Sequence, residues 1–109
     1  MIIGNYTVYH EIRNSPEYIL GIDAFRVAPK AREFLGDHPD ATGGEPGERG
    51  STIGGDGSEE LFIPVSGSFR KGTLYIKASE MSGQWHIDEL SLRLDGQSDW
   101  NDLLSPTSP

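Results

Sequence analysis

The histidines His10, His38 and His86 are the side chains best suited to bind a metal, but they lie far apart in the sequence. Zinc sites use pairs of histidines or cysteines a few residues apart, and none of the three has a second histidine at such a spacing. The chain has no cysteine, which excludes disulfides, iron–sulfur clusters and a cysteine nucleophile. We therefore expect no metal and no cofactor. His86 is interpreted as an exposed strand residue on the face opposite Trp85.

Carboxylates are abundant, yet their spacing marks none of them for catalysis. Residues 56–60 and 95–99 are acidic, but neither segment follows the twelve-residue calcium loop with its terminal glutamate. The sequence contains no G-x-S-x-G nucleophile elbow and no G-x-x-x-x-G-K-[ST] phosphate loop. No pair of carboxylates stands out for general acid and base work. We expect no catalytic residues and predict that the protein is not an enzyme.

The charge balance narrows the class of partner. Seventeen Asp and Glu against nine Lys and Arg give a net charge of -8, so nucleic-acid phosphates and anionic lipids would repel the chain. Residues 40–60 hold six of the acids, one base and seven of the fourteen glycines. This composition is typical of a mobile acidic loop or a weak edge hairpin. Nucleic acid is therefore not an expected partner.

A length of 109 residues suffices for one small domain. We predict a single domain over residues 1–104, followed by a disordered proline-rich tail over 105–109. No stretch approaches the ~20 apolar residues that span a bilayer, and the first residues lack the apolar core of a signal peptide. As written, the chain is expected to be soluble and not to insert into a membrane.

The first half of the chain has the signals of helices. Ser15 and Pro16 fit the cap and first position of a helix, and an apolar stripe follows, formed by Tyr18, Ile22 and Phe25. Pro29 predicts a break near residue 28, and a second helix over residues 29–35 is expected to bury Ala31, Phe34 and Leu35 and end at Gly36. Before Ser15, the stripe of Tyr6, Tyr9 and Ile12 favours a helix, although a strand would also suit residues 2–9.

The second half is predicted to be antiparallel sheet. Residues 61–65 and 73–78 alternate as strands, and Pro64 favours an edge or a bulge because it cannot donate a ladder hydrogen bond. Residues 81–84 predict a hairpin turn in which Gly83 supplies the positive φ. In the last long strand, Trp85 and Ile87 are odd-numbered, whereas the three leucines from residue 90 to 94 are even-numbered. One apolar face is then possible only if a bulge near residues 88–89 absorbs one residue.

These elements predict an α+β fold, with N-terminal helices packed on one face of a mainly antiparallel sheet. After the last strand, Trp100, Leu103 and Leu104 are expected to form a small apolar cluster.

Four segments resemble the cytochrome oxidase complex assembly protein 1 family, which is related in fold to the membrane-anchored presequence-translocase subunit. They are the helical run ending at residues 34–36, then residues 61–67, 71–76 and 83–90, with the glycine-rich middle in its expected place. Together they cover most of residues 15–104. The resemblance implies a helical layer on an antiparallel sheet, and a non-enzymatic module that contacts membrane-complex subunits during respiratory oxidase assembly. It offers no catalytic residues to carry over.

Members of this family usually carry an N-terminal membrane helix, whereas this chain begins almost at its first expected domain helix. Either an anchor has been removed or the protein is a free-standing soluble member. In the second case a cytoplasmic or membrane-peripheral location is expected.

The resulting hypothesis is a protein-interaction module with respiratory-complex subunits as the implied partners. Its partner surface is expected at Phe62 and Pro64, or at Trp100, because an extended peptide can add to an open strand edge.

Two alternatives remain open. One is a small-ligand binder with a pocket between the helices and the sheet, lined by Tyr18, Phe25, Tyr75 and Trp85. The other is a homo-oligomer formed through a strand edge or through the stripe of Tyr6, Tyr9 and Ile12.

Overall fold

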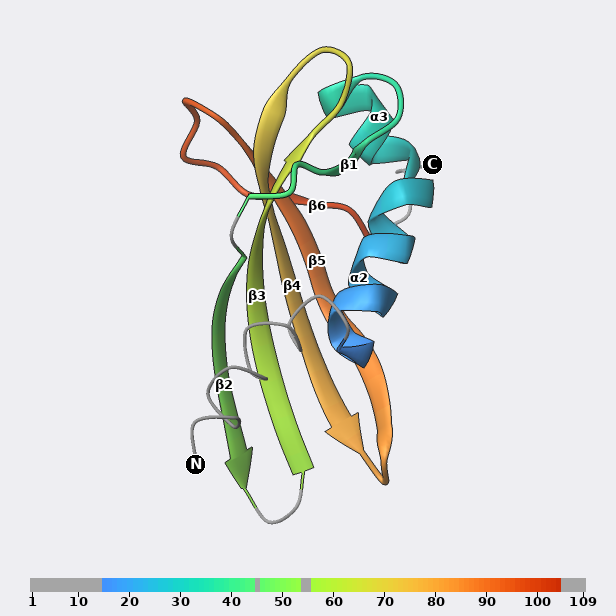
Figure 1. Ribbon diagram of the computed structural model, residues 1–109, viewed down its shortest axis with the longest axis vertical. Coiled ribbons are helices and arrows are strands. Elements are labelled where there is room, and N and C mark those ends of the chain that lie inside the picture. The colour runs from blue at the N-terminus through green and yellow to red at the C-terminus, as the bar shows by residue number, and fades with distance from the viewer. Residues whose placement is uncertain (1–14, 45, 54–55, 105–109) are drawn as a thin grey trace.

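Two helices cover one face of a six-stranded antiparallel sheet in the computed structural model, which describes residues 15–44, 46–53 and 56–104 (Figure 1). The helices are α2 (Pro16–Val27) and α3 (Pro29–Leu35). The strands are β1 (Asp40–Ala41), β2 (Gly47–Ile53), β3 (Asp56–Ser66), β4 (Lys71–Met81), β5 (Gln84–Leu94) and β6 (Asn101–Asp102). They are ordered β1-β3-β4-β5-β6, and β2 also pairs with β3. The predicted α+β class is confirmed, whereas the expectations for residues 1–14 and 105–109 lie outside the described residues.

The helix boundaries follow from local sequence signals. Ser15 caps α2 by accepting a hydrogen bond from the Tyr18 amide at 3.4 Å, and Pro16 occupies the first turn. The break falls at Ala28, which is extended because Pro29 follows it. Helix α3 ends at Gly36, whose φ of 95° is one that glycine adopts easily. These expectations are confirmed, except that Phe34 is half-buried instead of buried.

The core lies between the helices and one face of β3, β4 and β5. Ile22 and Phe25 of α2, with Ala31 and Leu35 of α3, supply the helical side. The sheet supplies alternate residues: Leu61, Ile63 and Val65 from β3, Leu74, Ile76 and Ala78 from β4, and Leu90, Leu92 and Leu94 from β5. Because alternate strand residues point to opposite faces, the residues between them lie on the face away from the helices.

Helix α2 approaches the sheet most closely at Gly21. A Cβ atom placed on Gly21 would lie 2.8 Å from Ile76 Cγ1 and 2.9 Å from Ile76 Cγ2. Such contacts are too short for real side chains, so glycine lets the helix backbone rest directly on Ile76. The absence of a side chain at residue 21 therefore sets the spacing between helix and sheet.

The predicted bulge in β5 is present. Lys77 pairs with Glu89 and the next residue, Ala78, pairs with Ile87, so the register shifts and Asp88 has no residue opposite it. This extra residue keeps Ile87 on the same face as Leu90, where it packs against the core. By the same alternation Trp85 lies on the helix side of the sheet, and His86 is exposed as expected.

Pro64 lies at a gap between two short partners of β3. Strand β1 pairs with residues 65–66 and β2 pairs with residues 56–62, while the register between β3 and β4 continues unbroken past Pro64. The Pro64 carbonyl accepts a hydrogen bond from the Thr42 amide at 2.9 Å. The nitrogen of Pro64, which has no hydrogen to donate, points in the same direction, away from β4. The missing donor of Pro64 therefore interrupts no hydrogen bond between β3 and β4, and β3 has no bulge against β4 at this residue.

The expected cluster of Trp100, Leu103 and Leu104 is wrong. Leu103 is buried in the core, and its amide donates to the Leu90 carbonyl at 2.8 Å. Trp100 is 41% exposed and lies on the opposite face. The reason is that residues 100 and 103 flank the extended strand β6, and an odd separation in extended chain directs two side chains to opposite faces.

Candidate functional site

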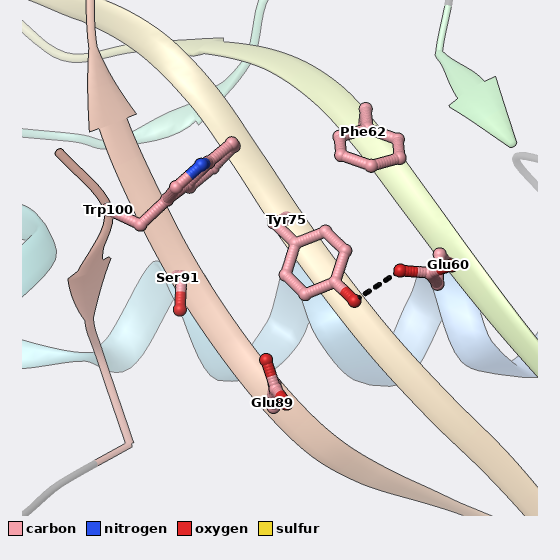
Figure 2. Close-up of a pocket in the computed structure, with 6 residues that line it drawn as sticks. All are labelled: Glu60, Phe62, Tyr75, Glu89, Ser91 and Trp100. Atoms are coloured by element: carbon pink, nitrogen blue, oxygen red, sulfur yellow. Dashed lines mark hydrogen bonds between the residues drawn. The ribbon is translucent and has the colours of Figure 1, made fainter. Parts of the chain in front are cut away.

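Three aromatic rings gather on the sheet face that points away from α2 and α3, as Figure 2 shows. The rings belong to Phe62 of β3, Tyr75 of β4 and Trp100, which directly precedes β6. With three polar residues they line a hollow of about 330 Å³. We call this the aromatic hollow, lined by Glu60, Phe62, Tyr75, Glu89, Ser91 and Trp100.

Strand pairing places the first two rings side by side. Phe62 and Tyr75 are directly paired across β3 and β4, and their ring centroids lie 5.2 Å apart with the planes tilted by 45°. The Tyr75 hydroxyl donates a hydrogen bond of 2.5 Å to the Glu60 carboxylate (Figure 2). Tilted pairs at this separation are favourable for aromatic rings. Together, these contacts fix the orientation of the Tyr75 ring.

The third ring reaches the other two across β5. Tyr75 is paired with Ser91 of β5, and Ser91 and Trp100 line the hollow together. The centroids of Tyr75 and Trp100 are 5.8 Å apart, with the planes tilted by 60°. The Arg93 guanidinium lies 5.0 Å from the centroid of the Trp100 ring, which is a cation–π distance. Trp100 therefore contacts both the Tyr75 ring and the Arg93 guanidinium.

The carboxylates of Glu60 and Glu89 line part of the aromatic hollow. Glu60, Lys77 and Glu89 form one row across β3, β4 and β5. A second hollow of about 440 Å³ adjoins the first, sharing two lining residues with it. It is lined by Asp88, Glu89, Ser91, Asp102 and Leu104. The two hollows form one surface that is aromatic at one end and acidic at the other.

Two of the three residues expected to bind a partner lie in the aromatic hollow, and the third lies outside it. Phe62 and Trp100 line the aromatic hollow together, whereas Pro64 does not line it. Pro64 lies two residues along β3 from Phe62, beside Gly44, where an added Cβ would lie 3.3 Å from Pro64 Cγ. Their roles as partner contacts remain predictions.

Sequence reasoning missed the remaining residues of the aromatic hollow. Tyr75 alternates with the core residues Leu74 and Ile76, and this alternation indicates the opposite face of the strand, but it does not show that Tyr75 lies beside Phe62 and Trp100. The positions of Glu89 and Ser91 depend on the bulge, which the sequence indicated, and on the pairing of β4 with β5, for which the sequence offered no direct signal.

The residues predicted to line a ligand pocket between the helices and the sheet do not all lie on that side of the sheet. Phe25 is fully buried in the core, while Tyr75 faces the opposite side of the sheet and lines the aromatic hollow. The two rings are separated by the sheet itself, because Tyr75 occupies an outward-facing position on β4. They therefore cannot line one pocket.

Other chemistry is sparse in the described part of the chain. Within residues 15–44, 46–53 and 56–104, no three histidine or acidic side chains are placed so that they could hold a metal ion. Over the same residues, neither helix has the length and apolar character needed to cross a bilayer. The aromatic hollow is therefore the candidate site that we consider further.

The fold belongs to the class of small α+β domains with a helical layer on one antiparallel sheet. The family model described as cytochrome oxidase complex assembly protein 1 matches residues 1–105, and the chain belongs to this family of oxidase assembly factors. The family expected from the sequence is thereby confirmed. No curated protein and no solved structure gives a significant match to the chain.

Proposed function

We propose that the protein is a non-enzymatic interaction module that holds a protein subunit during assembly of a membrane oxidase complex. Membership of an assembly-factor family supports this role. The observation that carries it is the aromatic hollow, in which Trp100 remains 41% exposed on a sheet face away from the helices. Exposed tryptophan and tyrosine are enriched where proteins bind one another.

The contact surface follows from the arrangement of the rings. Phe62 and Tyr75 are held in place by strand pairing, and Trp100 directly precedes the paired residues 101–102. The ring centroids lie 5.2 and 5.8 Å apart. Such rigid rings lose little conformational entropy when a partner covers them. The proposed partner-binding residues are therefore Phe62 and Trp100, with Tyr75 between them, and Pro64, which lies outside the hollow two residues along β3 from Phe62.

Affinity capture of the full-length protein from its own cells tests this function. Soluble and detergent-extracted fractions are analysed by mass spectrometry for the wild type and for Trp100→Ala. The matched control is Phe69→Ala, because Phe69 is 71% exposed in the turn after β3 and lies outside the hollow. All three proteins are first compared by thermal unfolding, so that loss of fold is recognised.

We expect oxidase subunits among the proteins captured by the wild type and by Phe69→Ala, and their loss with Trp100→Ala at nearly unchanged Tm. Equal capture by Trp100→Ala would refute the hollow as the contact surface. Capture of no membrane-complex subunit by the wild type would refute the assembly role itself.

A further inference from the structure

We propose that the aromatic hollow receives an arginine side chain from a basic, extended segment of the protein partner. This inference rests on the proposed function and specifies the chemistry of the partner. It starts from the combination of rings and carboxylates in one hollow of about 330 Å³. Phe62, Tyr75 and Trp100 supply π faces, which attract cations, and Glu89 supplies a negative charge beside them.

Charge complementarity decides the kind of occupant. Of the described residues that line the two adjoining hollows, four are acidic and none is basic; the acids are Glu60, Asp88, Glu89 and Asp102. Two bases lie at the border of this surface. Lys77 stands in the row between Glu60 and Glu89, and Arg93 lies over Trp100. With these included the surface still carries two negative charges in excess, within a chain of net charge -8.

The geometry favours arginine over lysine. A guanidinium is planar, stacks on aromatic rings and can donate two parallel hydrogen bonds to one carboxylate, whereas an ammonium is a compact and strongly hydrated charge. The protein already uses this stacking, since the Arg93 guanidinium lies 5.0 Å from the centroid of the Trp100 ring. A guanidinium in the hollow would contact the rings and reach Glu89, which faces it from β5 (Figure 2).

The second hollow extends the recognition beyond one residue. It continues from Glu89 and Ser91 to Asp88 and Asp102, so a second base in the same partner segment would lie over carboxylates. An extended segment suits this shape because its side chains are spaced along the surface. The partner sequence that fits is therefore a short exposed stretch with one arginine and another base close to it.

The test uses the full chain and a capped Gly/Ser peptide with two arginines separated by one residue. Binding is followed by the two indole N–H signals in proton–nitrogen NMR spectra. Trp100 lines the hollow, whereas Trp85 lies on the other side of the sheet and serves as an internal reference. The control peptide carries citrulline, a neutral isostere, in place of both arginines.

We expect the arginine peptide to shift the Trp100 signal in a saturable way and to leave Trp85 unmoved, with weaker binding at high salt. Glu89→Gln should weaken binding about tenfold, because it removes one charge-assisted contact. The matched control is Glu33→Gln, which removes the same charge from the exposed surface of α3 and should bind like the wild type. Ser91→Leu should abolish binding by filling the hollow while keeping the strand hydrogen bonds.

Three results would overturn the proposal. If the citrulline peptide shifted the Trp100 signal as much as the arginine peptide, the charge of the arginine would have no role. If Glu33→Gln weakened binding as much as Glu89→Gln, the effect would come from the net charge of the protein and not from Glu89. A Trp100 signal that moves with protein concentration in the absence of peptide would assign the hollow to a second copy of the chain.

The proposed function is judged separately. If cellular capture requires Trp100 but is unaffected by Glu89→Gln, and the arginine peptide does not bind, the interaction role stands and the arginine chemistry is refuted. If the arginine peptide binds as expected but cellular capture does not require Trp100, the arginine site stands and the assembly contact through the hollow is refuted.

Discussion

The close contact between Gly21 and Ile76 makes a quantitative prediction about the spacing of helix and sheet. In Gly21→Ala the new Cβ would lie under 3.0 Å from three Ile76 atoms, and Ile76 is fully buried. Overpacking of this kind costs about 1–3 kcal/mol, while alanine gains about 1 kcal/mol over glycine inside a helix. We therefore expect a net loss of about 1 kcal/mol and a Tm lower by about 4 °C.

A double-mutant cycle isolates the contact. Ile76→Val alone should cost about 1 kcal/mol through the lost methyl group. In the Gly21→Ala background the methyl that it removes, Cδ1, is one of the atoms in conflict, so the same change should cost almost nothing. The expected coupling energy is about 1 kcal/mol. Urea unfolding followed by far-UV circular dichroism measures all four proteins.

The control exchanges another buried isoleucine. Ile63 is 2% exposed on β3 and is not among the atoms nearest to Gly21, so Ile63→Val should add to Gly21→Ala without coupling. The reasoning is refuted if Ile76→Val costs the same in both backgrounds to within about 0.4 kcal/mol. It is also refuted if Gly21→Ala stabilises the protein.

Three further changes test other parts of the structure by urea unfolding. Ser15→Ala removes the cap that accepts from the Tyr18 amide and should cost about 1 kcal/mol; an unchanged midpoint would contradict the capping role. Gly72→Ala would place a Cβ 2.5 Å from the Arg93 carbonyl oxygen and should cost about 2–3 kcal/mol, whereas Gly47→Ala, with its nearest atom at 3.7 Å, should cost much less. Arg26→Gln removes two hydrogen bonds to Asp40, of 3.0 and 2.9 Å, from an exposed ion pair; the loss should stay below about 1 kcal/mol and vanish in 1 M salt.

The parts of the fold that local sequence determines were predictable. The start of α2 depends on Ser15 and Pro16, and its end depends on Pro29, all within one turn of the boundary. The bulge at Asp88 was predictable for a different reason. Strand β5 has apolar residues at both odd-numbered and even-numbered positions. All of them can face the core only if the strand contains one extra residue between the two groups.

The aromatic hollow was not predictable in the same way. Phe62, Tyr75 and Trp100 lie 13 and 25 residues apart in the chain, and only the strand order and register bring them together. The cluster expected around Trp100 failed because apolar type alone does not say which face a residue occupies. A two-residue strand, β6, separated Trp100 from Leu103, and such a short element carries no periodic pattern.

The bulge in β5 also bears on how the molecule avoids aggregation. Among the described strands, β6 pairs with β5 only at Ser91 and Leu92. Residues 84–89 of β5 therefore lie at the edge of the sheet (Figure 1). A regular edge strand is a template to which another chain can add. In β5 the extra residue, Asp88, interrupts the regular spacing of backbone donors and acceptors, and its charge opposes an added strand. The irregularity that gives β5 one apolar face thus also protects its edge from other chains.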